Sequence, residues 1–398
     1  MGKSSKDKRD IYYRLAKEQN WRARSAFKLI QLDEQFDLFS YEDPRKCTRV
    51  VDLCAAPGSW SQVLSRVLIK GESFGRRTWI EKQAKLFGGP NNAAFNSLDT
   101  PAKLSLSEGV GSLPSDKEPS QGGAQDETVL IPRENVKIVA IDLQPMAPLD
   151  GIVTLKADIT HPSTVPLLLK ALDPDYDDGQ MTETHQVDLV ISDGAPDVTG
   201  LHDLDIYVQS QLLHSALTLA MKVLKPGGKF VAKIFRGRNV DLIYAQLKLV
   251  FSRVHVAKPR SSRASSIEAF VVCEGFRPIA GWTPEIGASI KAQKPISNLT
   301  SERQRRHVRE DGITELAIDT AYGYAERYIA PFLACGDLSA WDADASYKLP
   351  AGYVSLDPVQ PPTAPPYKAA LEKRRMDGGA YGKTIKRDKN TNPPPKDA

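Results

Sequence analysis

Residues 49–65 of this 398-residue chain read RVVDLCAAPGSWSQVLS and carry the signature of a strand, a tight turn and a helix. The apolar run at 49–53 has the length of a buried strand. The residues AAPG at 55–58 are small, so the backbone can turn sharply there and approach a ligand. We therefore predict a strand over 49–53, a ligand-binding turn, and a helix over 59–69.

The same alternation of strands and helices continues along the chain. The pattern predicts further strands at 136–142, 152–158, 187–193, 228–235, 253–258 and 267–273, and helices at 10–39, 163–172, 204–224 and 239–250. Strands that alternate with helices form a mostly parallel sheet covered on both faces. About eight residues separate the last two strands, too few for a helical crossover, so these strands should pair antiparallel. The predicted fold class is α/β, Rossmann-like, with a mostly parallel seven-stranded sheet whose last strand is antiparallel.

Two stretches depart from this pattern. Residues 71–135 are rich in Gly, Pro, Ser and charge, and we interpret most of them as a disordered insertion. Beyond residue 280 we expect a helical piece at 300–330 and then a Pro-rich basic tail. The chain thus divides into a main domain at 1–280 and a C-terminal extension at 281–398.

Composition excludes several classes of protein. No apolar run approaches the roughly 20 residues of a membrane span, and the N-terminus MGKSSKDKRDIYYR lacks the apolar stretch of a signal peptide. We therefore expect a cytoplasmic protein without membrane contact. The four cysteines form no CxxC pair and the six histidines are dispersed, which argues against a disulfide framework and against a metal site.

Basic residues are concentrated in three segments, although the net charge is only +4. Residues 1–28 hold nine Lys or Arg against three acids, residues 251–263 hold four and no acid, and residues 368–398 hold nine against four. Clustered positive charge is typical of proteins that bind a polyanion. We favour that interpretation for the first two segments and a solubilising tail for the third. Three aromatic residues in the first segment would either stack on nucleic-acid bases or cover the core: Tyr12, Tyr13 and Trp21.

Acidic residues stand at the ends of four successive predicted strands. In a doubly wound sheet, ligands bind beyond the carboxyl ends of the strands, and an acid after the second strand can accept hydrogen bonds from ribose hydroxyls. Asp is also common in turns and helix caps, but four such positions in succession are harder to explain that way. These residues are Asp52, Asp142, Asp158 and Asp193.

Three further charged residues stand at unusual places. Lys233 lies inside the apolar strand KFVAKIF, Glu268 opens the buried strand that ends in AFVVC, and Lys28 follows Ser25-Ala-Phe in an amphipathic helix. The alternatives are a surface helix residue for Lys28 and a lysine that reaches water at a strand end for Lys233.

The turn AAPG is not a GxGxxG fingerprint, so a nicotinamide oxidoreductase is disfavoured.

In combination, these motifs resemble the FtsJ-type RNA 2′-O-ribose methyltransferases. The motifs are SAFK (25–28), VVDLCAAPGSWSQVLS (50–65), VISDGAPDVTG (190–200), LKPGGKFVAKIFRG (224–237) and RSSRASSIEAFVVC (260–273). A later stretch, PFLACGDLSAWDAD (331–344), resembles the eukaryotic cytosolic subgroup that acts on tRNA anticodon loops. The resemblance covers about residues 5–70 and 136–280, with parts of 325–345.

The resemblance implies an enzyme whose catalytic domain is 1–280 and which methylates the ribose 2′-hydroxyl of anticodon-loop nucleotides, at positions 32 and 34, from S-adenosylmethionine. It implies tRNA as partner, with an accessory WD-repeat protein and a large helical-repeat protein. We expect no metal, because the leaving group of this reaction is neutral and the cofactor carries its own activation. The implied catalytic set is Lys28, Asp193, Lys233 and Glu268, and the implied cofactor contacts are Gly58, Trp60, Asp142, Asp158 and Asp193.

One spacing departs from this family pattern. Asp142 lies 84 positions after Gly58, whereas about 20 is usual in Rossmann folds, so the insertion at 71–135 must loop out. Three alternatives stay open: ribosomal RNA or an mRNA cap as substrate, a non-catalytic RNA-binding protein on the same fold, and the disfavoured oxidoreductase. Lys233 is predicted to deprotonate or orient the ribose hydroxyl, but the sequence leaves the direction of its pKa shift open.

Overall fold

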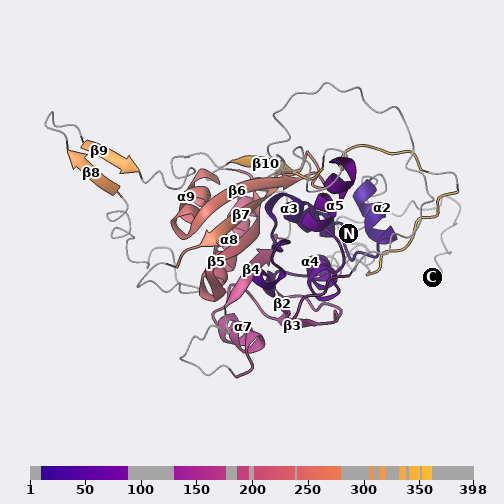
Figure 1. The fold of residues 1–398 in the computed structure, drawn as a ribbon, viewed down its shortest axis with the longest axis horizontal. Coiled ribbons are helices and arrows are strands. Elements are labelled where there is room, and N and C mark those ends of the chain that lie inside the picture. Colours follow the sequence, from indigo (N-terminus) through magenta and orange to yellow (C-terminus); the bar gives the residue numbers. More distant parts are fainter. Residues whose placement is uncertain are drawn as a thin grey trace, which may run out of the picture.

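A computed structural model describes residues 10–87, 130–175, 186–196, 201–237, 240–278, 304–308, 314–318, 331–337, 340–349 and 352–360. At its centre lies an eight-stranded sheet in the order β10-β6-β7-β5-β4-β1-β2-β3 (Figure 1). Its strands are β1 (Arg49–Leu53), β2 (Lys137–Asp142), β3 (Ile152–Lys156), β4 (Val187–Ser192), β5 (Leu224–Phe235), β6 (Phe251–Pro259), β7 (Glu268–Phe276) and β10 (Phe332–Cys335).

The pairing of the strands confirms the predicted fold class. The central strand β1 pairs parallel with both β2 and β4, and β4 pairs parallel with β5. The last predicted strand, β7, lies between β5 and β6 and is antiparallel to both. β10 is an addition to the seven strands predicted: it comes from the C-terminal extension and pairs parallel with β6 at the edge.

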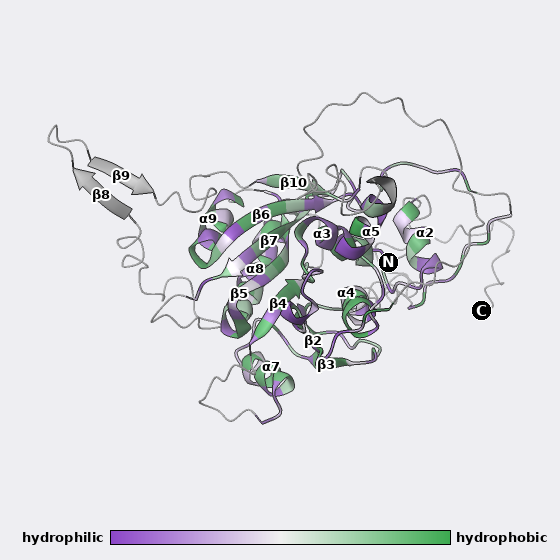
Figure 2. Cartoon of the chain, in the orientation of Figure 1, coloured by the Kyte–Doolittle hydropathy of each residue, from purple (hydrophilic) through white to green (hydrophobic). Residues whose placement is uncertain are grey.

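Helices cover both faces of the sheet, and each face has its own core. The helices are α2 (Ile11–Glu18), α3 (Ala26–Phe36), α4 (Ser59–Leu64), α5 (Arg76–Phe87), α7 (Thr164–Leu172), α8 (His202–Val223) and α9 (Val240–Val250), with short turns η1 (Pro44–Lys46) and η2 (Ser65–Ile69). Side chains of α2, α3 and α4 pack on one face and those of α7, α8 and α9 on the other. Successive strand residues alternate between the two cores, as Val50 and Val51 do. Figure 2 shows hydrophobic residues on the strands of the sheet and on parts of the helices that cover it.

The helix predicted over 10–39 is wrong at its centre, because the structure has two helices there. Asp10 caps α2, since its Oδ1 accepts the backbone N–H groups of Tyr12 (3.0 Å) and Tyr13 (3.3 Å). After α2 the chain passes through Asn20, whose φ of 58° is left-handed and ends helical geometry. Residues 19–25, called the linker below, then lead into α3.

Part of the segment 71–135, most of which was predicted to be a disordered insertion, forms a helix. Residues 76–87 form α5, which packs against α3. The N–H of Arg76, its first residue, donates to Asp33 Oδ2 at 2.8 Å, and Trp79 is buried with Arg76 over its ring. A buried tryptophan and a carboxylate from another helix are enough to hold a segment whose own composition is polar. Residues 88–129 lie outside the described residues.

In the C-terminal extension, the helical piece expected at 300–330 is wrong where the structure describes it. Residues 304–308 form β8 (Gln304–Val308) and residues 314–318 form β9 (Thr314–Ile318), and the two pair antiparallel. The sequence between them contains Asp311-Gly312, a pair that favours tight hairpin connections. Of the Pro-rich basic tail expected after the helical piece, residues 361–398 lie outside the described part of the chain.

Candidate active site

Four charged side chains from four different elements meet at the carboxyl edge of the sheet. Lys28 lies in α3, Asp193 directly follows β4, Lys233 lies in β5 and Glu268 begins β7. Lys233 Nζ lies 2.7 Å from Asp193 Oδ1 and 3.7 Å from Glu268 Oε2, and Lys28 Nζ lies 2.6 Å from Glu268 Oε1. The structure therefore brings together the four residues predicted as the catalytic set, called the tetrad below.

The register of β5 and β7 explains this convergence. Phe235 is paired with Glu268 and Lys233 with Phe270, so the carboxylate at the start of β7 lies near the lysine inside β5. Lys28 Nζ lies 5.9 Å from the centre of the Phe270 ring, which supports the lysine from one side. All four tetrad side chains are at most 18% exposed, so they interact in a site with little water.

The two lysines have opposite pKa shifts. Burial lowers the pKa of Lys28, and the carboxylates Glu268 and Asp193 only partly oppose this. Burial also acts to lower the pKa of Lys233, but Asp193 and Glu268 together outweigh it and raise that pKa. For Glu268, burial acts to raise the pKa, while Lys28 and Lys233 outweigh it and lower the pKa to about 2. The protein alone therefore holds Lys233 as an ammonium ion between two carboxylates.

Two buried contacts fix the backbone around Asp193. Gln209 of α8 donates from Nε2 to the carbonyl of Lys233 at 2.8 Å and to that of Gly194 at 3.1 Å. A Cβ at Gly194 would lie 2.9 Å from the Sγ of Cys54, so the loop after β4 packs directly on the turn after β1. The tetrad and the predicted cofactor turn are therefore in contact.

The predicted cofactor residues gather at the neighbouring strand ends. Gly58 has a φ of 95°, a conformation that favours glycine. Asp142 ends β2, and its Oδ2 accepts the N–H of Ala56 at 2.8 Å, so the 84-residue separation does not move it away from the turn. Asp158 lies beyond the end of β3, where its Oδ1 accepts the N–H (2.8 Å) and hydroxyl (2.7 Å) of Thr160 in a local turn. Small residues beside a carboxylate at two strand ends fit an adenosine-containing cofactor.

Trp60 is placed differently from the other predicted cofactor residues. Its indole is 1% exposed, donates from Nε1 to the carbonyl of Ser25 at 2.9 Å, and lies 5.6 Å from the Phe270 ring. The side chain thus joins α4 to the linker and to β7. Its predicted contact with the cofactor stays a prediction.

Sequence reasoning missed several supporting residues because they act on backbone atoms or on other side chains. Ser262 donates its hydroxyl to Glu268 Oε1 at 2.8 Å. Arg22, in the linker, donates to carbonyls of Pro57, Ala147 and Pro148. The motif RSSRASS around Ser262 was visible, but nothing in the sequence distinguishes this serine from its neighbours.

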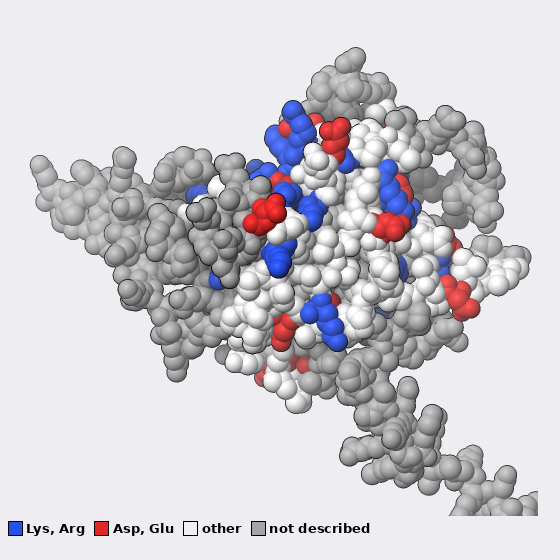
Figure 3. Space-filling view, turned by 90° about the horizontal axis from the view of Figure 1, so that it is seen from below, with Lys and Arg blue, Asp and Glu red and all other residues white. Residues whose placement is uncertain are grey.

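The basic segments predicted for polyanion binding are partly engaged within the protein. Arg24 and Arg263 both pair with the buried carboxylate of Asp10. Tyr12 and Trp21 are 3% and 1% exposed, so they cover the core and do not offer surfaces for bases. Figure 3 shows Lys and Arg side chains on one face with Asp and Glu among them.

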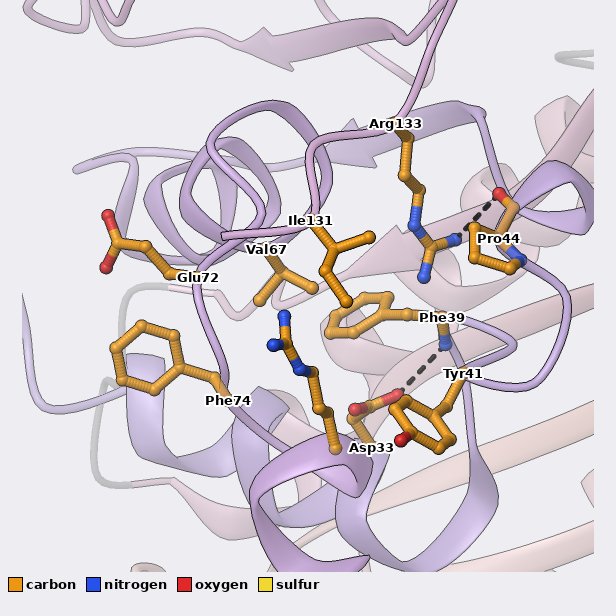
Figure 4. Close-up of a pocket in the computed structure, with 10 residues that line it drawn as sticks. Asp33, Phe39, Tyr41, Pro44, Val67, Glu72, Phe74, Ile131 and Arg133 are labelled. Atoms are coloured by element: carbon orange, nitrogen blue, oxygen red, sulfur yellow. Dashed lines mark hydrogen bonds between the residues drawn. The ribbon is translucent and has the colours of Figure 1, made fainter. Parts of the chain in front are cut away.

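A separate pocket lies between the end of α3, η2 and α5 (Figure 4). None of its lining residues belongs to the tetrad or to the strand-end acids. It is lined by Asp33, Phe39, Tyr41, Pro44, Val67, Glu72, Phe74, Arg77, Ile131 and Arg133.

Within the part of the chain that the structure describes, no helix is long and apolar enough to cross a membrane. The same residues contain no group of three or more His, Cys, Asp or Glu that could hold a metal ion. All four cysteines are free thiols.

Comparison with known proteins yields a consistent set of relatives. A family model described as FtsJ-like methyltransferase matches residues 21–81 and 127–276. A tRNA (cytidine(32)/guanosine(34)-2′-O)-methyltransferase of Schizosaccharomyces pombe is 48% identical over 94% of this chain and 97% of its own length. The protein of the same name from Homo sapiens is 43% identical over 97% of this chain and 88% of its own length. A tRNA (guanosine(34)-2′-O)-methyltransferase of Drosophila melanogaster is 38% identical over 94% of this chain and 88% of its own length.

Proposed function

Because this chain belongs to the FtsJ-like methyltransferase family, we propose that it transfers a methyl group from S-adenosylmethionine to the ribose 2′-hydroxyl of tRNA nucleotides 32 and 34, in the anticodon loop. The observation that carries this proposal is the convergence of Lys28, Asp193, Lys233 and Glu268 within hydrogen-bonding or ion-pair distance beside the turn at Gly58. A non-catalytic RNA-binding protein would not require two buried lysines to be held between two carboxylates.

The choice of tRNA over ribosomal RNA or an mRNA cap is supported by the relatives. Those described above are named for tRNA positions 32 and 34, or for position 34, and the alignments extend over nearly the whole of this chain. The alignments include the C-terminal extension, which the family model does not match. We propose the same nucleotides as substrates here.

In this reaction, bound S-adenosylmethionine supplies an electrophilic methyl group on a positively charged sulfur. Lys233 would accept the proton of the 2′-hydroxyl while the hydroxyl oxygen takes the methyl group. The broken carbon–sulfur bond would leave its electron pair on sulfur, with neutral S-adenosylhomocysteine as the leaving group. Asp193 and Glu268 orient the Lys233 amine, and Lys28 holds Glu268 in place at 2.6 Å. Lys233 must be neutral to accept a proton, so it first releases its own proton to solvent. Lys28 and the sulfonium charge both favour that release.

We propose that Gly58, Asp142 and Asp158 bind the cofactor, with Asp193 at the boundary between the cofactor and the tetrad. Gly58 gives the turn after β1 its shape through a φ of 95°, and Asp142 stands at the strand end where a ribose is usually held. Positioning of the two reactants at this edge supplies much of the rate, since the chain itself needs only to align them and remove one proton.

We further propose that the reaction takes place in the cytoplasm and that two accessory proteins direct the enzyme to its nucleotides. One is a WD-repeat protein and the other a large helical-repeat protein, as the family resemblance implies. Affinity purification of the protein from cells tests the partnership. If neither a WD-repeat protein nor a helical-repeat protein is recovered with it, the partnership is contradicted.

The decisive experiment compares Lys233→Ala with the unaltered protein on a tRNA transcript and a ribosomal RNA fragment. We expect methylation of the tRNA only, at nucleotides 32 and 34, and a loss of roughly 10²- to 10⁴-fold in the variant. Binding of S-adenosylhomocysteine serves as the control for folding. Near-normal turnover by the variant, or methylation of the ribosomal fragment alone, would overturn the proposal.

A further inference from the structure

Arg22 bridges two loops that are far apart in the sequence. Its Nη1 donates to the carbonyl of Pro57 at 3.2 Å and to that of Ala147 at 2.9 Å, while its Nη2 donates to the carbonyl of Pro148 at 3.0 Å. Pro57 belongs to the turn after β1, and Ala147 and Pro148 belong to the loop after β2. One guanidinium therefore connects the turn that holds Gly58 with the loop that follows Asp142.

The backbone that carries Arg22 is itself anchored to the first of these loops. The N–H of Arg22 donates to Gln62 Oε1 at 2.9 Å, and Gln62 Nε2 donates to the carbonyl of Asn20 at 2.7 Å. Gln62 belongs to α4, which follows the turn directly. The linker therefore cannot shift without disturbing α4, and the backbone of Arg22 is held in place.

The guanidinium also packs against the glycine of the turn. A Cβ on Gly58 would lie 2.6 Å from Arg22 Nη1, too close for any real contact. The φ of 95° favours glycine at this position, and a Cβ there would displace the Arg22 guanidinium from its carbonyl partners. Arg22 and Gly58 form one unit at the edge of the proposed cofactor site.

We propose that Arg22 is a positioning residue that fixes the separation of the turn after β1 and the loop after β2, so that both are preorganised to bind S-adenosylmethionine. This inference rests on the proposed function. Arginine suits the role because its planar fork has donors for three carbonyls at once, whereas a lysine ammonium is a single point. When loops become ordered only on binding, the lost conformational entropy weakens the affinity for the ligand. A bridge that orders the loops beforehand removes this loss.

The test is the variant Arg22→Lys, which keeps the charge and loses the fork. We expect the Kd for S-adenosylhomocysteine, measured by titration calorimetry, to rise about tenfold, as the loss of one charged hydrogen bond predicts. The KM for S-adenosylmethionine should rise in parallel, while kcat at saturating cofactor and the Kd for tRNA stay within about twofold of the unaltered protein.

A matched control is available in the same molecule. Arg133 also donates from one guanidinium nitrogen to two carbonyls, those of Pro44 (3.2 Å) and Cys47 (2.9 Å), but these residues precede β1, whereas the turn follows it. Arg133→Lys should therefore leave the Kd for S-adenosylhomocysteine unchanged.

Two outcomes would overturn the inference. The first is an unchanged Kd for S-adenosylhomocysteine in folded Arg22→Lys. The second is a higher Kd for tRNA, with a shallower dependence of that Kd on salt, while cofactor binding stays normal. This result would mean that Arg22 contacts a phosphate of the tRNA. Failure of the proposed function would look different, because the unaltered protein would then not bind S-adenosylhomocysteine at all.

Discussion

At the scale of single residues, the raised pKa of Lys233 leads to a prediction about the pH dependence of the reaction rate. The pKa of Lys233 is raised above 10.5, so at neutral pH the neutral amine that accepts the proton is a small fraction. If that fraction limits the rate, kcat/KM should rise about tenfold per pH unit between pH 7 and 9. Steady-state rates with the unaltered protein measure this slope.

The variant Lys233→Arg separates proton removal from orientation. Arginine keeps the positive charge beside Asp193 and Glu268 but stays protonated throughout this range. We expect no measurable turnover although S-adenosylhomocysteine still binds. A flat pH profile together with an active arginine variant would show that the residue only orients the hydroxyl.

A second prediction concerns Asp52, which is completely buried in β1. Burial raises its pKa to about 7, although the Ser61 hydroxyl donates to its Oδ2 at 2.6 Å and acts in the other direction. This folded-state pKa exceeds that of Asp in the unfolded chain. The contribution of Asp52 to the free energy of unfolding is therefore fully present below about pH 4 and is lost as pH rises through 7. Asp52→Asn should therefore gain stability over the unaltered protein as pH rises.

Thermal unfolding at pH 5 and pH 8 measures that difference. We expect the advantage of Asp52→Asn to be larger at pH 8, by roughly 2 to 4 kcal/mol at most. The variant Ser61→Ala is a useful comparison, since removing the donor should make the loss of stability with pH steeper. Equal advantage at both pH values would mean that Asp52 is ionised in the folded protein without penalty.

The full tetrad, with Lys28, was predicted from the resemblance to the FtsJ-type family, and the unusual places of two of its members pointed to the same site. The residues that hold the tetrad in place were not predicted. A lysine inside an apolar strand and a glutamate at a strand start are visible in the sequence, because their charge conflicts with their surroundings. Arg22, Gln209 and Ser262 conflict with nothing locally. They act on carbonyls and carboxylates that only the folded chain brings near, so no local pattern distinguishes them.

At the scale of elements, α5 depends on its contacts with α3 more than on its own sequence. Trp79 is 7% exposed, and the N–H of Arg76 is capped by Asp33 of α3. Trp79→Ala should release this helix, since loss of a buried tryptophan costs about 3 to 5 kcal/mol in a core. Hydrogen exchange over residues 76–87 should then increase strongly.

The matched control for this prediction is Lys82→Ala on the same helix. Lys82 has a side chain 58% exposed and pairs with Asp337 at 3.7 Å, a contact of little energetic value. Its substitution should leave hydrogen exchange over α5 nearly unchanged. Equal protection in both variants would mean that Trp79 does not hold the helix.

The same dependence explains which elements the sequence predicted. Strands β1, β2, β4 and β7 are apolar runs buried on both faces, and this pattern is independent of distant contacts. α5 and β10 were missed because each is stabilised by partners elsewhere in the chain, α3 for one and β6 for the other. The helix over 10–39 was overextended because helical spacing continued across the left-handed Asn20.

At the scale of the whole molecule, the segment 331–349 binds both the sheet and the loop that precedes β7. β10 extends the sheet at β6, and the N–H of Arg260 donates to the carbonyl of Cys335 at 2.9 Å. Asp344 Oδ2 accepts the N–H of Ala264 at 2.6 Å. Both contacts hold the loop 260–267, which carries Ser262 and leads into Glu268.

A buried chain of hydrogen bonds reaches the same loop from the other side. The hydroxyl of Tyr12 donates to the carbonyl of Trp341 at 2.6 Å and accepts from Gln31 Nε2 at 3.1 Å. Gln31 Oε1 in turn accepts the N–H of Ser261 at 2.9 Å, next to Ser262. The C-terminal segment is thus linked through α2 and α3 to the residue that holds the Glu268 carboxylate.

We expect Tyr12→Phe, which removes only the hydroxyl, to lower the free energy of unfolding by about 1 to 3 kcal/mol. It should also lower kcat severalfold while the Kd for S-adenosylhomocysteine stays constant, because Ser262 then holds Glu268 less firmly. Combined with Ser262→Ala, the loss in kcat should be smaller than the product of the two single losses, since both act on one carboxylate. Tyr13→Phe provides the comparison, because its ring lies beside Lys17 outside the chain of hydrogen bonds. Multiplicative losses in the double variant would mean that the C-terminal segment stabilises the fold without positioning the tetrad.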